Sequence, residues 1–170
     1  MGLDYEIHLY FPIEQMQAVL EDVALMTQGI PTEKLDSEIC QGFYFPPDDV
    51  IYNHWADNPS GLAERTDAKG RIVPGALELQ VYEPDWAWAF GHNTKLREDI
   101  CVFEFRAISS AMSLILEQSP SIHQTFINLL KTHNGICAIF HDTDLVRRDE
   151  IVWPEDTSWS EVFKLLTQSP

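Results

Sequence analysis

Basic residues are scarce in this chain. Its 170 residues include 11 lysines and arginines against 27 aspartates and glutamates, which gives a formal net charge of −16. Such a charge repels phosphate groups, so we expect no binding to nucleic acids and none to anionic membranes. The acidic excess is uneven, because residues 1–85 hold 16 acids and 4 bases whereas residues 86–170 hold 11 acids and 7 bases. This charge favours a basic protein as a partner, although acidity alone also keeps a protein soluble.

Cysteines are few and do not form a recognisable pair. Cys40, Cys101 and Cys137 are odd in number and lack the Cys-x-x-Cys spacing, which argues against a zinc knuckle and a redox motif. Cys101 and Cys137 lie in apolar runs, so we expect them to be buried and inert. No apolar run approaches the roughly 20 residues of a membrane span, and no basic segment opens the chain as in a secretion signal. These features favour a reducing, cytoplasmic location.

Sequence motifs of catalytic and cofactor sites are also lacking. The chain contains no Gly-x-Gly-x-x-Gly, no Walker loop, no His-Glu-x-x-His and no Gly-x-Ser-x-Gly. We therefore predict no cofactor. An enzymatic activity stays open but is less favoured than a binding function.

Hydrophobic periodicity, in contrast, is well developed. Apolar and polar residues alternate over residues 3–11, 76–83 and 100–107, as in strands with one buried face. A continuous apolar run over 136–140 indicates a strand buried on both faces, with a neighbouring strand over 145–152. Spacings of three and four residues predict helices, which cover residues 13–28, 108–118, 120–133 and a C-terminal stretch capped by Thr157.

These elements predict a single domain of the α+β class over residues 1–170. We expect a mainly antiparallel or mixed sheet with helices packed on one face, and a ferredoxin-like variant is one such arrangement. Residues 42–75 are rich in proline, glycine and aspartate, which predicts a loop-rich β segment with a hairpin tip at residues 67–70. The expected core consists of Phe103, Phe105, Ile136, Ala138, Ile139 and Phe140.

The polar run after the apolar strand is the first candidate site. His141, Asp142 and Asp144 are residue types that bind divalent metals or exchange protons, and functional residues often lie on connections between elements. They predict, as one alternative, a small metal-dependent or acid–base enzyme, to which His54 and His92 could add ligands. The other interpretation is an ordinary turn, because aspartate and threonine are common turn residues.

A second candidate lies in the acidic, loop-rich segment. Asp48, Asp49 and Asp57 flank Trp55 in the sequence, and an aromatic residue ringed by charges suits an interface hot spot. Binding of a basic partner there would fit an acidic inhibitor or immunity-type protein. A protein-interaction function is therefore the first hypothesis, with the oligomeric state left open.

Overall fold

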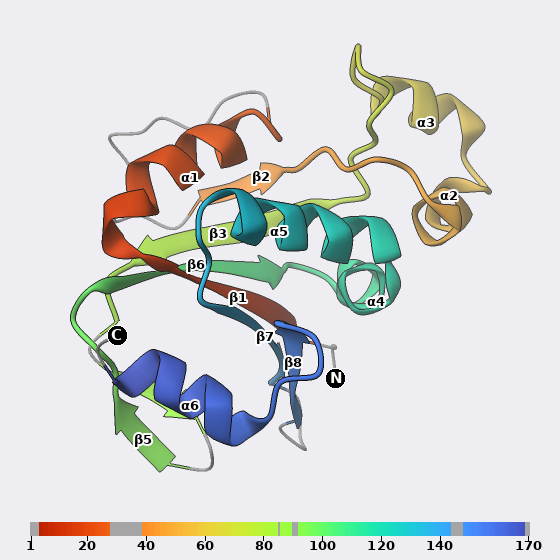
Figure 1. The fold of residues 1–170 in the computed structure, drawn as a ribbon. Coiled ribbons are helices and arrows are strands. Elements are labelled where there is room, and N and C mark those ends of the chain that lie inside the picture. Colours follow the sequence, from red (N-terminus) through yellow and green to blue (C-terminus); the bar gives the residue numbers. More distant parts are fainter. Residues whose placement is uncertain (1–3, 28–38, 85, 90–91, 144–147, 169–170) are drawn as a thin grey trace.

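The fold is built on a sheet of six strands, seen in a computed structural model that describes residues 4–27, 39–84, 86–89, 92–143 and 148–168. The strands are β1 (Tyr5–Pro12), β2 (Ile39–Gly42), β3 (Ala76–Tyr82), β4 (Trp86–Ala89), β5 (His92–Lys95), β6 (Ile100–Ala107), β7 (Cys137–Asp142) and β8 (Arg148–Trp153). The six-stranded sheet has the order β2-β3-β6-β1-β7-β8, and each neighbouring pair is antiparallel (Figure 1). Strands β4 and β5 pair separately.

Within the described residues, six α-helices join these strands. They are α1 (Met16–Ala24), α2 (Asp49–Trp55), α3 (Pro59–Glu64), α4 (Ser110–Gln118), α5 (Pro120–Thr132) and α6 (Trp159–Thr167), and a short 3₁₀ turn (Ile13–Gln15) precedes α1. None of these described helices is both long and apolar enough to cross a bilayer.

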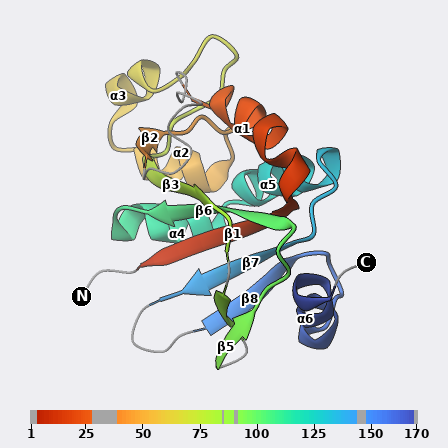
Figure 2. The same cartoon turned by 90° about the vertical axis from the view of Figure 1, so that its left-hand side faces the viewer.

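The connectivity confirms the predicted α+β class. Strands β1, β3, β6 and β7, taken with α1 and the α4–α5 pair, follow one another as β-α-β-β-α-β, which is the ferredoxin-like connectivity. Strand β2 extends this sheet beside β3, and β8 extends it beside β7. Helix α2 contacts α3 and α4, whereas α6 lies beside β7 and β8 (Figure 2).

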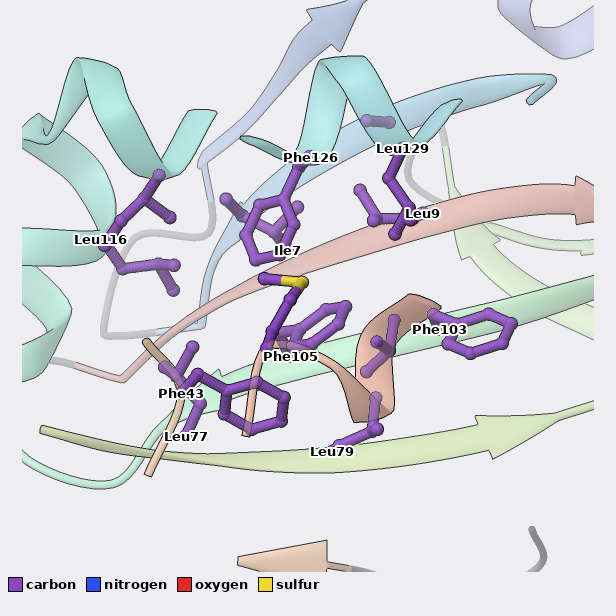
Figure 3. Close-up of a cluster of buried hydrophobic side chains, with 14 of the residues drawn as sticks. Ile7, Leu9, Phe43, Leu77, Leu79, Phe103, Phe105, Leu116, Phe126 and Leu129 are labelled. Atoms are coloured by element: carbon purple, nitrogen blue, oxygen red, sulfur yellow. The ribbon is translucent and has the colours of Figure 1, made fainter. Parts of the chain in front are cut away.

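The alternation in β1 and β6 builds the main core. Ile7 lies opposite Phe105 and Leu9 opposite Phe103, with all four side chains buried on the same face. Helices α1, α2, α4 and α5 cover that face, and Phe126 of α5 reaches Phe105 with ring centroids 4.6 Å apart (Figure 3). Each such burial contributes roughly 1.5–3 kcal/mol. The predicted core is confirmed except for Ile136, which is partly exposed.

Helix α6 packs on the opposite face of the sheet. The prediction that the helices cover one face therefore holds for α1, α2, α4 and α5 but not for α6. Its Val162 and Leu166 are buried against Tyr10, Val102 and Ile139. The helix packs here because its apolar stripe is buried against the apolar side chains on this half of the sheet. The helix begins one residue later than predicted, since Ser158, not Thr157, forms a capping box with Glu161.

The segment over residues 42–75 contains two short helices that the sequence did not reveal. Asp48 and Asn58 are the N-caps of α2 and α3, so residues interpreted as turn formers begin helices instead. The predicted hairpin tip is present, because the backbone N–H of Gly70 donates to the carbonyl of Asp67 and Gly70 has φ +76°. No long strands flank this tip among the described residues. Instead, Ile72 forms isolated antiparallel bridges with Thr66 and with Phe45.

Candidate functional site

Asp48 joins two helices within the fold. Its Oδ1 accepts a hydrogen bond from the backbone N–H of Ile51 at 2.9 Å, at the start of α2. Its Oδ2 accepts from the Ser119 hydroxyl at 2.6 Å and from the Ser121 backbone N–H at 3.0 Å, at the start of α5. Burial opposes ionisation, but these hydrogen bonds lower the pKa of Asp48 below its ordinary value. Both carboxylate oxygens are therefore engaged within the chain.

The other predicted interface residues are arranged around α2. Asp49 and Asp57 are exposed, whereas Trp55 is half-buried and packs against the core. The guanidinium carbon of Arg65 lies 3.9 Å from the centroid of the Trp55 ring, a cation–π contact. The structure thus brings exposed acids near the tryptophan as predicted, but it also places a basic group over the ring.

The structure does not place the side chains of His141 and Asp142 together in one site. Asp142 follows it on β7 and points to the other face of the sheet, and Asp144 lies outside the described residues. Instead, the His141 Nδ1–H donates to Oδ1 of Asp149 on β8 at 2.7 Å. Burial lowers the pKa of His141, although Asp149 opposes the shift, so the ring is neutral at neutral pH.

The His141 ring belongs to a larger group of polar side chains on the half of the sheet that α6 leaves uncovered. The ring centroids of His141 and His8 are 4.3 Å apart. His8 Nε2 lies 3.0 Å from Glu6 Oε1 and 3.6 Å from Glu104 Oε2. Arg106 donates to both carboxylates, at 3.2 Å each. Glu6, His8, Glu104, Arg106 and His141 are hereafter the polar cluster.

The electrostatics of the polar cluster favour the ionised form of Glu6. Burial acts to raise the pKa of Glu6, but hydrogen bonds and charge from His8 and Arg106 lower it from 4.5 to about 2. Glu104 is buried and accepts a further hydrogen bond from the Tyr82 hydroxyl at 3.0 Å. Chemically, such a cluster can hold a cation or exchange a proton.

A separate groove of about 370 Å³ runs between the α4–α5 helices and strand β8. Glu117, Glu150 and Glu155 line it, and no lysine or arginine is among the described residues at its wall. Ile127 and Phe140 contribute apolar surface. The His123 Nε2 lies 2.6 Å from the carbonyl oxygen of Leu116, and this contact links α5 to α4 beside the groove. The space bounded by these three glutamates is hereafter the acidic groove.

Comparison with known proteins yields no match. No protein-family model matches the chain, and none of the curated proteins or solved structures does. The two candidate sites are therefore judged by the contacts, burial and charge of their own residues.

Sequence reasoning missed both the polar cluster and the acidic groove. The signal for the cluster was present, since Glu6 and His8 share the polar face of one predicted strand and Glu104 and Arg106 share that of another. What was lacking was the strand order, which sets β1 beside both β6 and β7. The groove had no such signal, because Glu117 and Glu150 come from segments that only the packing of α5 on the sheet brings together.

Proposed function

We propose that the chain is an interaction protein of the inhibitor or immunity type, which binds a basic partner protein through the acidic groove. The observation that carries this proposal is the convergence of Glu117, Glu150 and Glu155 on one groove of an acidic protein. Carboxylates bind lysine and arginine side chains, and arginine does so through two parallel hydrogen bonds.

The apolar part of the groove supports the same occupant. Lysine and arginine have long aliphatic stems, which pack on apolar surface while the charged head stays with the carboxylates. Ile127, Phe140 and Val152 line the groove and supply such surface. A basic side chain from a partner therefore finds both charge and packing in one place.

The charge of the whole chain supports rapid association. A net charge of −16 attracts a basic partner from a distance, and the attraction is screened beyond about 8–10 Å at physiological salt. The exposed acids Asp49 and Asp57 of the α2 region contribute to this field. Their neighbour Trp55 lies beneath Arg65, which makes the α2 region a less favourable contact surface for a basic protein than the acidic groove.

The enzymatic alternative has weaker geometric support. It requires His141, Asp142 and Asp144 to act on one substrate, but His141 and Asp142 point to opposite faces of the sheet. The partner of His141 is Asp149, so any acid–base chemistry at this point would belong to the polar cluster instead.

The proposal is tested by capture of partners from the native host, followed by binding kinetics with the purified partner. Three variants carry the same change of charge: E150K/E155K in the acidic groove, D49K/D57K at α2, and E14K/E98K as a control at exposed positions elsewhere. We expect a basic partner, with binding weakened about ten-fold or more by the groove variant and much less by the control.

Two results would contradict the proposal. One is an acidic partner or the lack of any partner retained at low salt. The other is an equal loss of affinity in all three variants, because that outcome would show a response to net charge and not to the groove. A loss confined to D49K/D57K would move the interface to α2.

A further inference from the structure

Three potential metal-binding atoms converge within the polar cluster. Glu6, His8 and Glu104 each offer one of them, and the three atoms lie within 4.8 Å of one another. The nitrogen of His8 is 3.0 Å from the Glu6 oxygen and 3.6 Å from the Glu104 oxygen. Bonds of 2.0–2.2 Å to one tetrahedral ion require ligand atoms roughly 3.4 Å apart, so these separations need little adjustment.

The remaining carboxylate oxygens are already oriented. Arg106 holds Glu6 Oε2 through Nε and Glu104 Oε1 through a terminal nitrogen, both at 3.2 Å, which leaves the other oxygen of each carboxylate directed at His8. Glu78 lies 3.7 Å from the same guanidinium. The three glutamates share one arginine, so their combined formal charge is −2, which a divalent cation would neutralise.

An independent observation comes from His141. Its side chain is only 5% exposed, and its buried Nε2 has no hydrogen-bond partner within the described parts of the chain. A buried polar atom without a partner is costly and calls for a ligand or another explanation. Asp149 on β8 takes the Nδ1–H, so Nε2 carries the lone pair.

The His141 ring lies beside the cluster. The two nitrogens of an imidazole point away from each other, and Nδ1 points to β8 on one side of β7. Strand β1 is the other neighbour of β7, and the His8 ring on β1 has its centroid 4.3 Å from that of His141. His141 Nε2 is not among the three atoms that lie within 4.8 Å of one another, so a shift of its ring is needed to bring it to the ion.

We propose that Glu6, His8 and Glu104 bind one divalent transition-metal ion of the zinc class, and that a shift of the His141 ring adds its Nε2 as a fourth ligand. Two imidazoles and two carboxylates suit Zn²⁺, whereas Ca²⁺ and Mg²⁺ prefer sites made of oxygen atoms alone. Arg106 and Asp149 form the outer shell, since each fixes a ligand in place by a hydrogen bond.

The site is independent of the acidic groove and does not require the proposed partner. Its competitor is a purely structural polar network, in which His8 bridges Glu6 and Glu104 without a metal ion. The two differ in a simple way, because only a metal site binds Zn²⁺ with a fixed stoichiometry that depends on all four side chains.

Calorimetric titration of the full chain with Zn²⁺ alone tests the proposal. We expect about one Zn²⁺ per chain, and no comparable binding of Mg²⁺ or Ca²⁺. The nearly isosteric variants H8Q, E104Q and H141Q should each bind Zn²⁺ about ten-fold more weakly or worse. The control H54Q removes an exposed histidine outside the cluster and should bind like the unaltered chain.

The visible absorption of bound Co²⁺ is a second readout, which separates the loss of a metal ligand from a loss of folding. Co²⁺ in a four-coordinate N/O site has a strong visible absorption, which should appear in the unaltered chain and be lost in H141Q while its circular dichroism stays native. The proposal is overturned if the unaltered chain binds no stoichiometric Zn²⁺, or if H8Q and E104Q bind it as well as the unaltered chain does. Retention of the cobalt spectrum in H141Q would likewise overturn the role of that residue.

Discussion

On the helix-covered face of the sheet, four helices lie over a continuous apolar layer, whereas the opposite face is divided between α6 and the polar cluster. The difference originates in the same strands. In β1, Ile7 and Leu9 point to the first face, and Glu6 and His8 point to the second. The first face therefore contributes stability through burial, while part of the second face carries charged groups that must pair with one another.

The largest effect on stability is expected when one buried side chain on each face of the sheet is truncated to alanine. Phe105→Ala should lower the free energy of unfolding by about 3–5 kcal/mol, because Phe105 contacts Phe43 and Phe126 at full burial. Leu166→Ala on the α6 side should cost about 2 kcal/mol, the lower end for a buried leucine, because its cluster is smaller.

Urea denaturation followed by circular dichroism gives both values. Equal losses in the two variants would show that the α6 side is as tightly packed as the helix-covered face. A loss below about 1 kcal/mol for Phe105→Ala would show that the assigned core is wrong.

A smaller effect on stability is expected at Asp48, whose carboxylate joins α2 to α5. Asp48→Asn removes an ionised acceptor that holds α2 and α5 together, and it should cost about 1–2 kcal/mol at neutral pH. The pKa of Asp48 is lowered in the folded chain, so its ionised form adds stability that is present above the unfolded value of 3.8 and is lost as pH falls through the lower folded value.

The pH dependence of the unfolding free energy tests this role of Asp48. The difference in stability between the unaltered chain and Asp48→Asn should shrink as the pH falls from about 4 through the lowered folded pKa of Asp48, because below that value both side chains are neutral. A constant difference down to pH 2–3 would mean that the carboxylate charge at Asp48 has no role. Asp49→Asn, at the exposed neighbouring position, serves as the matched control.

The last comparison concerns the reactivity of the buried thiols, one of which lies on each face of the sheet. Cys101 belongs to the core of the helix-covered face and Cys137 to the α6 side, and both are buried, whereas Cys40 is exposed. Burial raises the pKa of Cys101 to about 12 and raises that of Cys137 as well. Thiol labelling at pH 8 should therefore modify Cys40 rapidly and the other two only after denaturant is added. Rapid labelling of Cys137 alone would show that α6 opens readily.

Much of the fold follows from patterns that are local in the sequence. Period-two alternation predicts β1, β3 and β6, and the Ser119–Pro120 pair predicts the start of α5, where the Ser119 hydroxyl caps the helix. The short helices α2 and α3 escaped prediction because they begin with aspartate, asparagine and proline, residues that also form turns.

Whatever depends on distant residues was decided by the tertiary structure alone. Asp48 looks like a surface acid in the sequence, yet its partner Ser119 is 71 residues away. His141 was paired by sequence proximity with Asp142 and Asp144, but the sheet pairs it with Asp149 and brings it against His8. The physical reason is that a residue pattern specifies which face of a strand is polar, whereas only strand order and helix packing specify which polar faces meet.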